Sequence, residues 1–204
     1  MAHIPVAERR PQLVQAAIEL MAREGVNAGS TRAVAAELGV AQATVHYTFG
    51  TKQELYRAVL EELTHSLVAQ VEQVPPVGPG FAATVSSWID VLWQTVLEQR
   101  DRHLLLAELT TFALRDPYLH EAMTEHTRNI TAVVIRLVTE AARGAGLDLA
   151  VEPEAVARFF LTGFDGLTLR YLTECEDEPA NAQLRHLRAA TIALATGRLS
   201  ADPQ

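Results

Sequence analysis

The sequence predicts an all-α protein of about nine helices, and two observations carry that prediction. Apolar residues recur every three or four positions over long segments, as they do on one face of an amphipathic helix. No segment alternates apolar and polar residues in the way that a half-buried strand does. With 204 residues, the chain is long enough to bury a core in one large domain or two small ones.

Four helices are expected in the N-terminal part. Gly25 provides an end for the first helix, since glycine readily adopts the left-handed conformation that follows a helix. Ser30 and Thr51 are suitable N-caps for the second and fourth helices. We therefore expect a helix-turn-helix domain over residues 1–52, with a connecting helix at about 51–73. The four expected helices cover about residues 8–24, 30–39, 41–47 and 51–73.

The clearest break in the helical pattern is Val74-Pro75-Pro76-Val77-Gly78-Pro79-Gly80, because a helix cannot continue through these prolines. We expect a C-terminal domain over residues 74–204. Within it, Pro117 and Pro153 stand where the first turn of a helix accepts proline. The five helices expected there cover about residues 81–99, 102–114, 117–143, 153–173 and 181–196.

Residues 30–52 have the spacing that a helix-turn-helix requires. Val34 and Ala35 precede Gly39, and Val45 follows six residues later. A small residue lets the two helices approach, glycine accepts the turn, and a branched apolar residue packs the second helix onto the first. The second helix of such a motif lies in the major groove of DNA. The segment therefore predicts a DNA-binding protein.

The charge distribution is compatible with DNA binding, although the net charge is −8. Residues 1–60 carry six basic and five acidic residues, whereas the remainder carries 11 basic and 20 acidic residues. The N-terminal part can therefore meet phosphates while the acidic remainder stays away from the duplex.

The order of a helix, a helix-turn-helix and then Tyr-x-Phe-x-x-Lys before a fourth helix resembles the tetracycline-repressor (TetR) family of bacterial transcription regulators. The resemblance covers about residues 8–60, while the C-terminal part is similar only in the number and length of its helices. The matching residues are Ala16-Ala17, Leu20, Gly25-Val26, Ser30, Val34-Ala35, Leu38-Gly39-Val40, Thr44-Val45, Tyr47, Phe49, Lys52 and Leu55.

The resemblance implies which residues contact bases. Arg32 matches a position whose arginine can reach guanine, and Gln42 one whose glutamine can pair with adenine. Ala43 can contact a thymine methyl group. Ala41 and His46 depart from the family, which often has serine and usually has tyrosine there. His46 is either a pH-dependent phosphate contact or a neutral spacer.

Other residues are implied to contact phosphates. Thr44, Tyr47 and Lys52 match positions that fix the register of the protein on DNA. Ser30 and Thr31 begin the second helix, whose N-terminus can itself face a phosphate.

The C-terminal helices of this family form a dimer interface and a ligand pocket. Gly163 and Gly166 lie within one expected helix, where glycine costs up to about 1 kcal/mol relative to alanine, and this favours a close approach of two helices. The approach could be between subunits or within one chain. The candidate residues for a homodimer interface are Phe160, Gly163, Leu167, Leu184, Leu187 and Ile192.

Candidate residues for a small-molecule pocket lie on apolar helix faces, where ordinary core packing is the alternative. His126 interrupts such a face, so we expect it to bind either a ligand or a neighbouring Glu or carbonyl group. Glu108 and Asp165 would favour a cationic ligand if buried, unless Arg158 or Arg136 pairs with them. The candidates are Trp88, Leu92, Leu109, Phe112, Met123, His126, Ile130, Phe164 and Tyr171.

Other functions are not expected. His120 and His126 are six positions apart, whereas a helical zinc-binding pair is spaced by four. The single cysteine, Cys175, stands among acidic residues and has no cysteine neighbour for a metal site. We therefore expect no catalytic residue, metal or cofactor. No apolar run reaches the roughly 18 residues of a membrane span, and nothing indicates export, so a cytoplasmic protein is expected.

The resulting hypothesis is a homodimeric repressor that binds a palindromic, double-stranded operator and is released by a small, largely apolar effector. Two alternatives remain open. One is an activator or a ligand-independent regulator of the same fold, and the other is a helical ligand-binding or scaffolding protein without a role on DNA.

Overall fold

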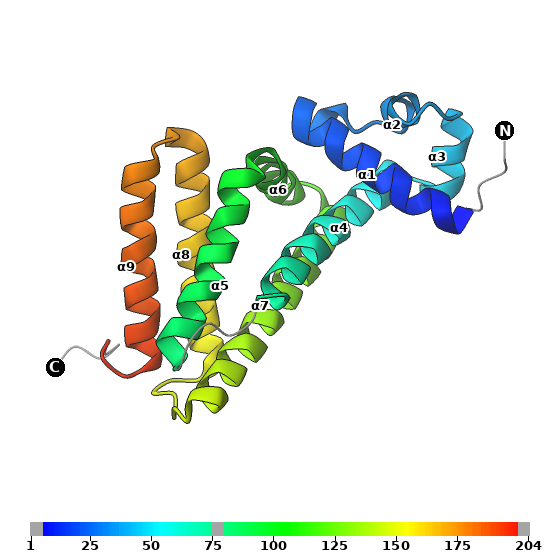
Figure 1. Ribbon diagram of the computed structural model, residues 1–204. Coiled ribbons are helices and arrows are strands. Elements are labelled where there is room, and N and C mark those ends of the chain that lie inside the picture. The colour runs from blue at the N-terminus through cyan, green and yellow to red at the C-terminus, as the bar shows by residue number, and fades with distance from the viewer. Residues whose placement is uncertain (1–5, 75–79, 200–204) are drawn as a thin grey trace. The chain divides into compact units, whose positions relative to one another are not determined.

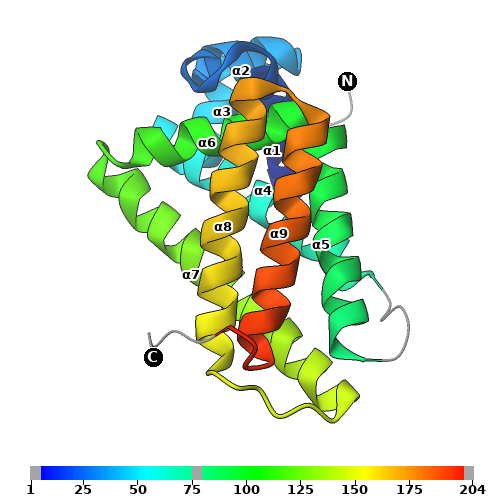
Figure 2. The ribbon, with the colours of Figure 1, turned by 90° about the vertical axis from the view of Figure 1, so that its left-hand side faces the viewer.

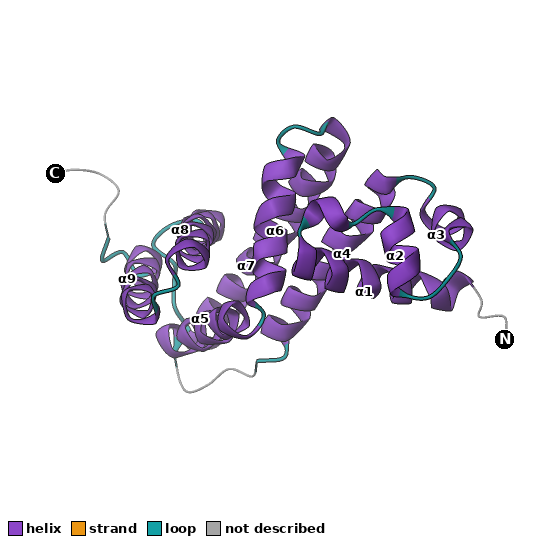
Figure 3. Ribbon diagram, turned by 90° about the horizontal axis from the view of Figure 1, so that it is seen from above, coloured by secondary structure: helices purple, strands orange, loops and turns teal. Residues whose placement is uncertain are grey.

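The computed structural model describes residues 6–74 and 80–199, and all regular structure in this part of the chain is helical (Figures 1 and 3). This confirms the all-α prediction. The expected helix break at residues 75–79 lies outside the described residues. The helices are α1 (Val6–Glu24), the 3-10 helix η1 (Val26–Ala28), α2 (Thr31–Glu37), α3 (Gln42–Phe49), α4 (Lys52–Glu72), α5 (Phe81–Glu98), α6 (Arg100–Ala113), α7 (Pro117–Ala145), α8 (Pro153–Glu174) and α9 (Asp177–Ala195).

The helices form two compact units. Unit 1 consists of residues 1–66 and 99–126, and unit 2 of residues 67–98 and 127–204. This division differs from the expected linear boundary at residue 74, because α6 packs on α1 and η1 and so belongs with the N-terminal helices. The long helices α4 and α7 each contribute to both units.

The core of unit 1 is built from the apolar faces of α1, α2, α3, α4 and α6. Leu13 and Ala17 of α1 are fully buried, as their spacing of one helical turn predicts. Val34 of α2 and Val45 of α3 are also fully buried in this core, so the two helices of the helix-turn-helix pack as expected. Leu105 of α6 is 1% exposed in the same core.

Local signals in the sequence define the ends of these helices. The Ser30 hydroxyl accepts a hydrogen bond from the Ala33 N–H at 3.1 Å, which confirms the predicted N-cap. Gly39 has a φ of +67°, and Val40 N–H donates to the carbonyl of Ala35 at 2.9 Å. This is the pattern of a Schellman end, so the predicted glycine stop of α2 is also confirmed.

Unit 2 contains α5, α8, α9 and the C-terminal part of α7. Figure 2 shows α8 and α9 side by side, and they make the most extensive helix–helix packing in the chain. The Trp93 ring of α5 packs edge-on against Phe164 at 6.2 Å and Tyr171 at 5.2 Å. Its indole N–H donates to the Asn181 side chain of α9 at 3.1 Å. These contacts join α5, α8 and α9 around one core.

One helix begins earlier than expected. The pattern predicts a last helix from residue 181, but α9 begins at Asp177. Proline is tolerated in the first turn of a helix, so Pro179 does not prevent this earlier start. Asp177 and Glu178 further favour the first turn, because carboxylates stabilise the N-terminal end of a helix. No helix in the described part of the chain has the length and apolar character needed to cross a membrane.

Candidate nucleic-acid interface

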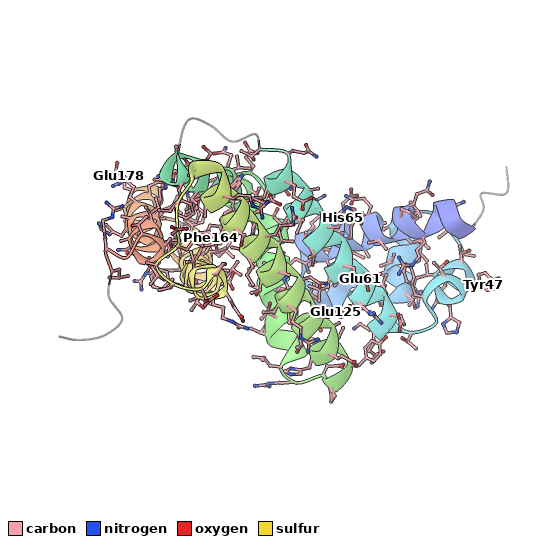
Figure 4. All side chains as sticks on the ribbon, turned by 90° about the horizontal axis from the view of Figure 1, so that it is seen from below. Tyr47, Glu61, His65, Glu125, Phe164 and Glu178 are labelled. Atoms are coloured by element: carbon pink, nitrogen blue, oxygen red, sulfur yellow. The ribbon has the colours of Figure 1, made fainter. Side chains whose placement is uncertain are left out.

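Helix α3 is buried on one face and presents a row of side chains to solvent on the other. Val45 is fully buried and Phe49 is 6% exposed, so these two residues hold the helix against unit 1. Tyr47 is 79% exposed, and Figure 4 shows its side chain projecting away from the helix. Burying so large an aromatic group would be favourable, which makes its exposure informative. The other exposed residues on α3 are Gln42, Ala43 and His46, and Thr44 is half-buried.

The start of α2 adjoins the start of α3. The Gln42 amide donates to the Thr31 hydroxyl at 3.4 Å, a long hydrogen bond between the two helices of the motif. Ser30 and Arg32 are exposed beside Thr31. The structure therefore brings the start of α2 and the start of α3 together, although Thr31 and Gln42 are eleven positions apart in sequence.

Lys52 stands exposed at the first position of α4. Its ammonium group lies 4.9 Å from the centroid of the Tyr56 ring, within the range of a cation–π contact. The hydroxyl of Thr51 accepts a hydrogen bond from Glu54 N–H at 3.1 Å and so caps the same helix, as predicted. Lys52 is thereby oriented by its own helix while its charged group remains accessible.

Ion pairing divides the basic residues of unit 1 into two groups. Arg23 pairs with Glu24 and Glu37, and Arg57 with Glu61 at 3.0 Å and Glu125 at 3.7 Å. Figure 4 labels Glu61 on α4 and Glu125 on α7. Within the described residues, no ion pair engages Arg10, Arg32 or Lys52. These three charges remain available for an external anion.

Arg10 was not among the predicted DNA-contacting residues. Its guanidinium lies 5.5 Å from the centroid of the Phe49 ring, so it stands beside the C-terminal end of α3. The sequence signal was present as the pair Arg9-Arg10 at the start of α1, but only the fold shows that Arg10 reaches α3.

Comparison with known proteins shows the family to which a chain with this helix-turn-helix surface belongs. Residues 13–59 match the family model of bacterial regulatory proteins of the tetR family. Residues 79–196, more than half of the chain, match the model of the tetracyclin repressor-like C-terminal domain. The chain belongs to the TetR family. It is a DNA-binding transcriptional regulator.

Several known proteins are similar to this TetR-family regulator over most of their length. The nicotine-responsive transcriptional repressor HdnoR of Paenarthrobacter nicotinovorans is 28% identical over 174 residues, which is 85% of this chain and 89% of that protein. A TetR-family regulator of Rhodococcus sp. has a TM-score of 0.77 and 19% identity, covering 93% of this chain and 99% of the other. The multidrug binding protein EbrR with ethidium has a TM-score of 0.72 and 24% identity, covering 92% and 98%. The two structural matches support the fold alone.

The residues expected to line an effector pocket of this TetR-family regulator fall into both units. In unit 1, Leu109 is 2% exposed in the core, and Phe112 packs edge-on against Tyr56 at 6.0 Å. In unit 2, Phe164 is buried against Trp93. Core packing accounts for the burial of Leu109 and Phe164. The half-buried members are Met123 and His126 in unit 1 and Trp88, Leu92, Ile130 and Tyr171 in unit 2.

His126 is engaged by a hydroxyl group. The Thr64 hydroxyl donates to the carbonyl of Leu60 at 2.7 Å, so it accepts a hydrogen bond from His126 Nδ1–H. Burial lowers the pKa of His126 to about 4, so the ring is neutral at pH 7. The expected partner was a ligand, a Glu or a carbonyl group. The partner in the structure is a threonine, and it leaves Nε2 as the acceptor nitrogen.

Glu108 has a partner that differs from the expected arginines. Its carboxylate accepts a hydrogen bond from the backbone N–H of Val26 at 2.8 Å. Arg158 pairs instead with Glu154, and Arg136 with Glu72. Asp165, the other acidic candidate, is exposed on α8. The predicted pairing with Arg158 or Arg136 is therefore wrong. Over the described residues, no group of three or more His, Cys, Asp and Glu side chains is placed to hold a metal ion.

The six residues expected at a dimer interface make packing contacts within the chain. Gly163 permits the close approach of Leu187, because a Cβ at Gly163 would overlap the Leu187 side chain. The glycine therefore serves contact between α8 and α9 of one chain, the alternative that the sequence left open. The other four are buried in unit 2, with exposures of 8% or less: Phe160, Leu167, Leu184 and Ile192.

A different stripe on α8 is left exposed. Phe159 is 38% exposed and Leu169 is 56% exposed, with Thr162 and Gly166 exposed between them. Their spacing of three and four residues places them on one face of the helix, so this face could have been recognised from the sequence. On α9, Ala182, His186, Ala189 and Ala193 follow the same spacing and are exposed or half-buried.

Proposed function

We propose that this protein is a homodimeric repressor that binds a palindromic operator and is released by a small, largely apolar molecule. The observation that carries the proposal is the exposed row on α3, with Tyr47 79% exposed beside Gln42. These side chains have no packing role in unit 1, whereas the opposite face of the helix is fully occupied by the core. The proposal includes no catalytic activity.

Two groups of residues have different roles in the proposed complex. Arg32, Gln42 and Ala43 contact base edges in the major groove, where each base pair presents a distinct pattern of donors and acceptors. The other group holds the sugar–phosphate backbone and fixes the register. It consists of Ser30, Thr31, Thr44, His46, Tyr47 and Lys52, to which the structure adds Arg10 as a candidate.

A twofold operator requires two copies of α3 about 34–36 Å apart, or a multiple of that spacing. We infer that the exposed stripes of α8 and α9 meet their counterparts in a second subunit. Phe159 and Leu169 supply the apolar contacts, and Gly166 leaves room for a partner because nothing lies within 4 Å of its Cβ position. Burying these two side chains would contribute about 1–3 kcal/mol each per subunit.

An effector of small size is supported by one similar protein, since HdnoR is a nicotine-responsive repressor. In this chain, the half-buried Trp88, Leu92 and Ile130 of unit 2 provide apolar surface for such a molecule. The effector must bind the conformation that cannot bind DNA more tightly than the conformation that can. Equal affinity for the two conformations would leave their equilibrium unchanged.

One other function remains as an outcome of the test. An activator or an effector-independent regulator would have the same DNA-binding surface. Membership of the TetR family excludes the other alternative, a scaffolding protein without a role on DNA.

The decisive experiment starts with random-sequence duplexes, from which the purified protein selects those that it binds. A palindromic consensus, bound in a salt-dependent manner, is expected. No enrichment of any sequence would contradict the regulator function. Transcription from a promoter containing the consensus then separates repression from activation, and a library of small apolar compounds tests release.

A further inference from the structure

The connection between α1 and α2 is held at a single residue by side chains from two other helices. The N–H of Val26 donates to Glu108 Oε2 of α6 at 2.8 Å. The carbonyl of the same residue accepts a hydrogen bond from the hydroxyl of Tyr56 on α4 at 2.5 Å. Tyr56 is 1% exposed and Val26 is 4% exposed, so both groups are shielded from water. Such bonds are costly to break, because a buried donor or acceptor is then left unpaired.

The residues on either side of Val26 are also constrained. Gly25 has a φ of +87°, and its Cβ position lies 3.4 Å from the Glu108 carboxylate. At Gly29, a Cβ would stand 2.6 Å from the sulfur of Met21 and 3.1 Å from the Tyr56 ring. The connection therefore packs closely against Met21 and Tyr56 at Gly29, and is in van der Waals contact with Glu108 at Gly25. Ser30, the N-cap of α2, follows Gly29 directly.

Tyr56 joins this connection to the proposed DNA-binding surface. Its ring packs edge-on against Phe112 of α6 at 6.0 Å and lies 4.9 Å from the ammonium group of Lys52. Glu108 and Phe112 are four positions apart and so lie on one face of α6. All of these residues belong to unit 1.

We propose that Glu108 and Tyr56 are positioning residues of the DNA-binding surface. They fix the α1–α2 connection, and with it Ser30, Arg32 and Lys52, in the arrangement that meets the duplex. The inference rests on the proposed DNA-binding function. If the connection is released, the surface must become ordered on binding, and that ordering lowers affinity. The number of phosphates contacted, and so the slope of affinity against salt, does not change.

The test compares three variants with two matched controls. Glu108→Ala removes the acceptor, Tyr56→Phe removes the hydroxyl while keeping the ring, and Glu108→Gln keeps an acceptor oxygen. Glu121→Ala removes an exposed carboxylate from α7, and Tyr118→Phe removes an exposed hydroxyl bonded to Glu54. The first readout is backbone amide exchange by mass spectrometry over residues 25–34.

Glu108→Ala and Tyr56→Phe should each accelerate exchange in this segment about tenfold, the effect of losing one hydrogen bond of about 1.4 kcal/mol. Exchange in α8 and α9 should not change. Glu108→Gln and both controls should remain within about twofold of the wild type, since each keeps both bonds to Val26. Wild-type exchange in both Glu108→Ala and Tyr56→Phe would overturn the inference.

The second readout is affinity for a fluorescein-labelled duplex that the wild type has selected from random-sequence DNA. Glu108→Ala should lose about tenfold in affinity with an unchanged salt slope, and Glu108→Gln should recover most of it. Faster exchange with wild-type affinity would overturn the positioning role. A flatter slope would also overturn it as stated, because it would mean that contacts between basic residues and phosphates are lost. A wild-type protein that selects no duplex would overturn the proposed function, whatever the exchange data show.

Discussion

Gln42 and Lys52 differ in the kind of contact that each side chain can make with DNA. Gln42 is exposed at the first position of α3, and its amide offers both a donor and an acceptor to a base edge. Lys52 presents one positive charge at the start of α4, which neutralises a phosphate of any sequence. Replacing Gln42 should therefore affect sequence discrimination, whereas replacing Lys52 should affect the affinity for DNA of any sequence.

Gln42→Ala should weaken binding to the selected operator by about 1–3 kcal/mol and leave binding to unrelated DNA nearly unchanged. Lys52→Ala should weaken both by a similar factor and reduce the salt slope by about 1, because one phosphate is no longer neutralised. Fluorescence anisotropy on two duplexes at several salt concentrations measures both quantities. If the two variants behave alike, the division into base-reading and phosphate-holding residues is incorrect.

His103 is buried and His126 is half-buried in unit 1, and both rings are neutral at pH 7. Burial lowers the pKa of each to about 4, from 6.5 in the unfolded chain. Between pH 6.5 and 4 the unfolded state therefore binds protons that the folded state does not. The free energy of unfolding should fall as the pH is lowered through this window, by about 3 kcal/mol at most for each histidine.

His126→Asn should remove about half of the histidine-dependent loss of stability between pH 6.5 and 4. Asparagine does not titrate, and its amide N–H can donate to the Thr64 hydroxyl in place of Nδ1–H. Urea unfolding at a series of pH values gives the comparison. The control is His120→Asn, which changes an exposed histidine on α7.

At the scale of one element, α8 contains two glycines three positions apart that face different surroundings. At Gly163 a Cβ would overlap Leu187 of α9, whereas nothing lies within 4 Å of the Cβ position of Gly166. Both residues have helical backbones, so alanine is intrinsically favoured over glycine by about 1 kcal/mol at each. Packing alone distinguishes them.

Gly163→Ala should be less stable than Gly166→Ala by about 1–2 kcal/mol, because the Leu187 side chain must give way before a Cβ fits at Gly163. Gly166→Ala should leave the stability of the subunit unchanged or raise it by up to about 1 kcal/mol. Denaturant unfolding at matched protein concentration tests this pair. Equal stability of the two variants would contradict the close approach at Gly163.

The elements that could be predicted from the sequence are those with local signals. Ser30 and Gly39 define the ends of α2 through hydrogen bonds to residues no more than five positions away. The interior and exterior faces of α8 could not be told apart in this way. Phe160 and Phe164 lie on one apolar stripe and Phe159 and Leu169 on another, so only the packing of α9 decides which stripe is buried.

The DNA-binding surface also combines residues that local sequence signals predict with residues that only tertiary packing brings together. The residues of α2 and α3 lie close together in sequence, so the motif itself predicts them. Glu108 is 82 residues from Val26, and Tyr56 is 30 residues from it. Neither spacing has a periodicity that would indicate contact, and the two bonds depend on how α6 and α4 pack against the core.

At the scale of the whole molecule, the proposed function depends on a second subunit. One copy of α3 reads one half-site, and a dimer gains affinity because binding at the second half-site is then intramolecular. The exposed stripe of α8 is the candidate interface, and Leu169 is its most exposed apolar side chain at 56%. Phe159 is the second large apolar side chain exposed on the same helix face, at 38%.

Leu169→Glu should convert the dimer to a monomer, since two carboxylates would be buried close together across the twofold axis. Operator affinity should fall by at least about 100-fold, while the helical content and the hydrogen-bonded connection at Val26 stay intact. Sedimentation velocity and anisotropy measure the two effects. Leu114→Glu is the matched control, because Leu114 is 72% exposed and belongs to unit 1, whereas α8 belongs to unit 2. A Leu169→Glu protein that remains dimeric and binds the operator normally would place the interface elsewhere on the molecule.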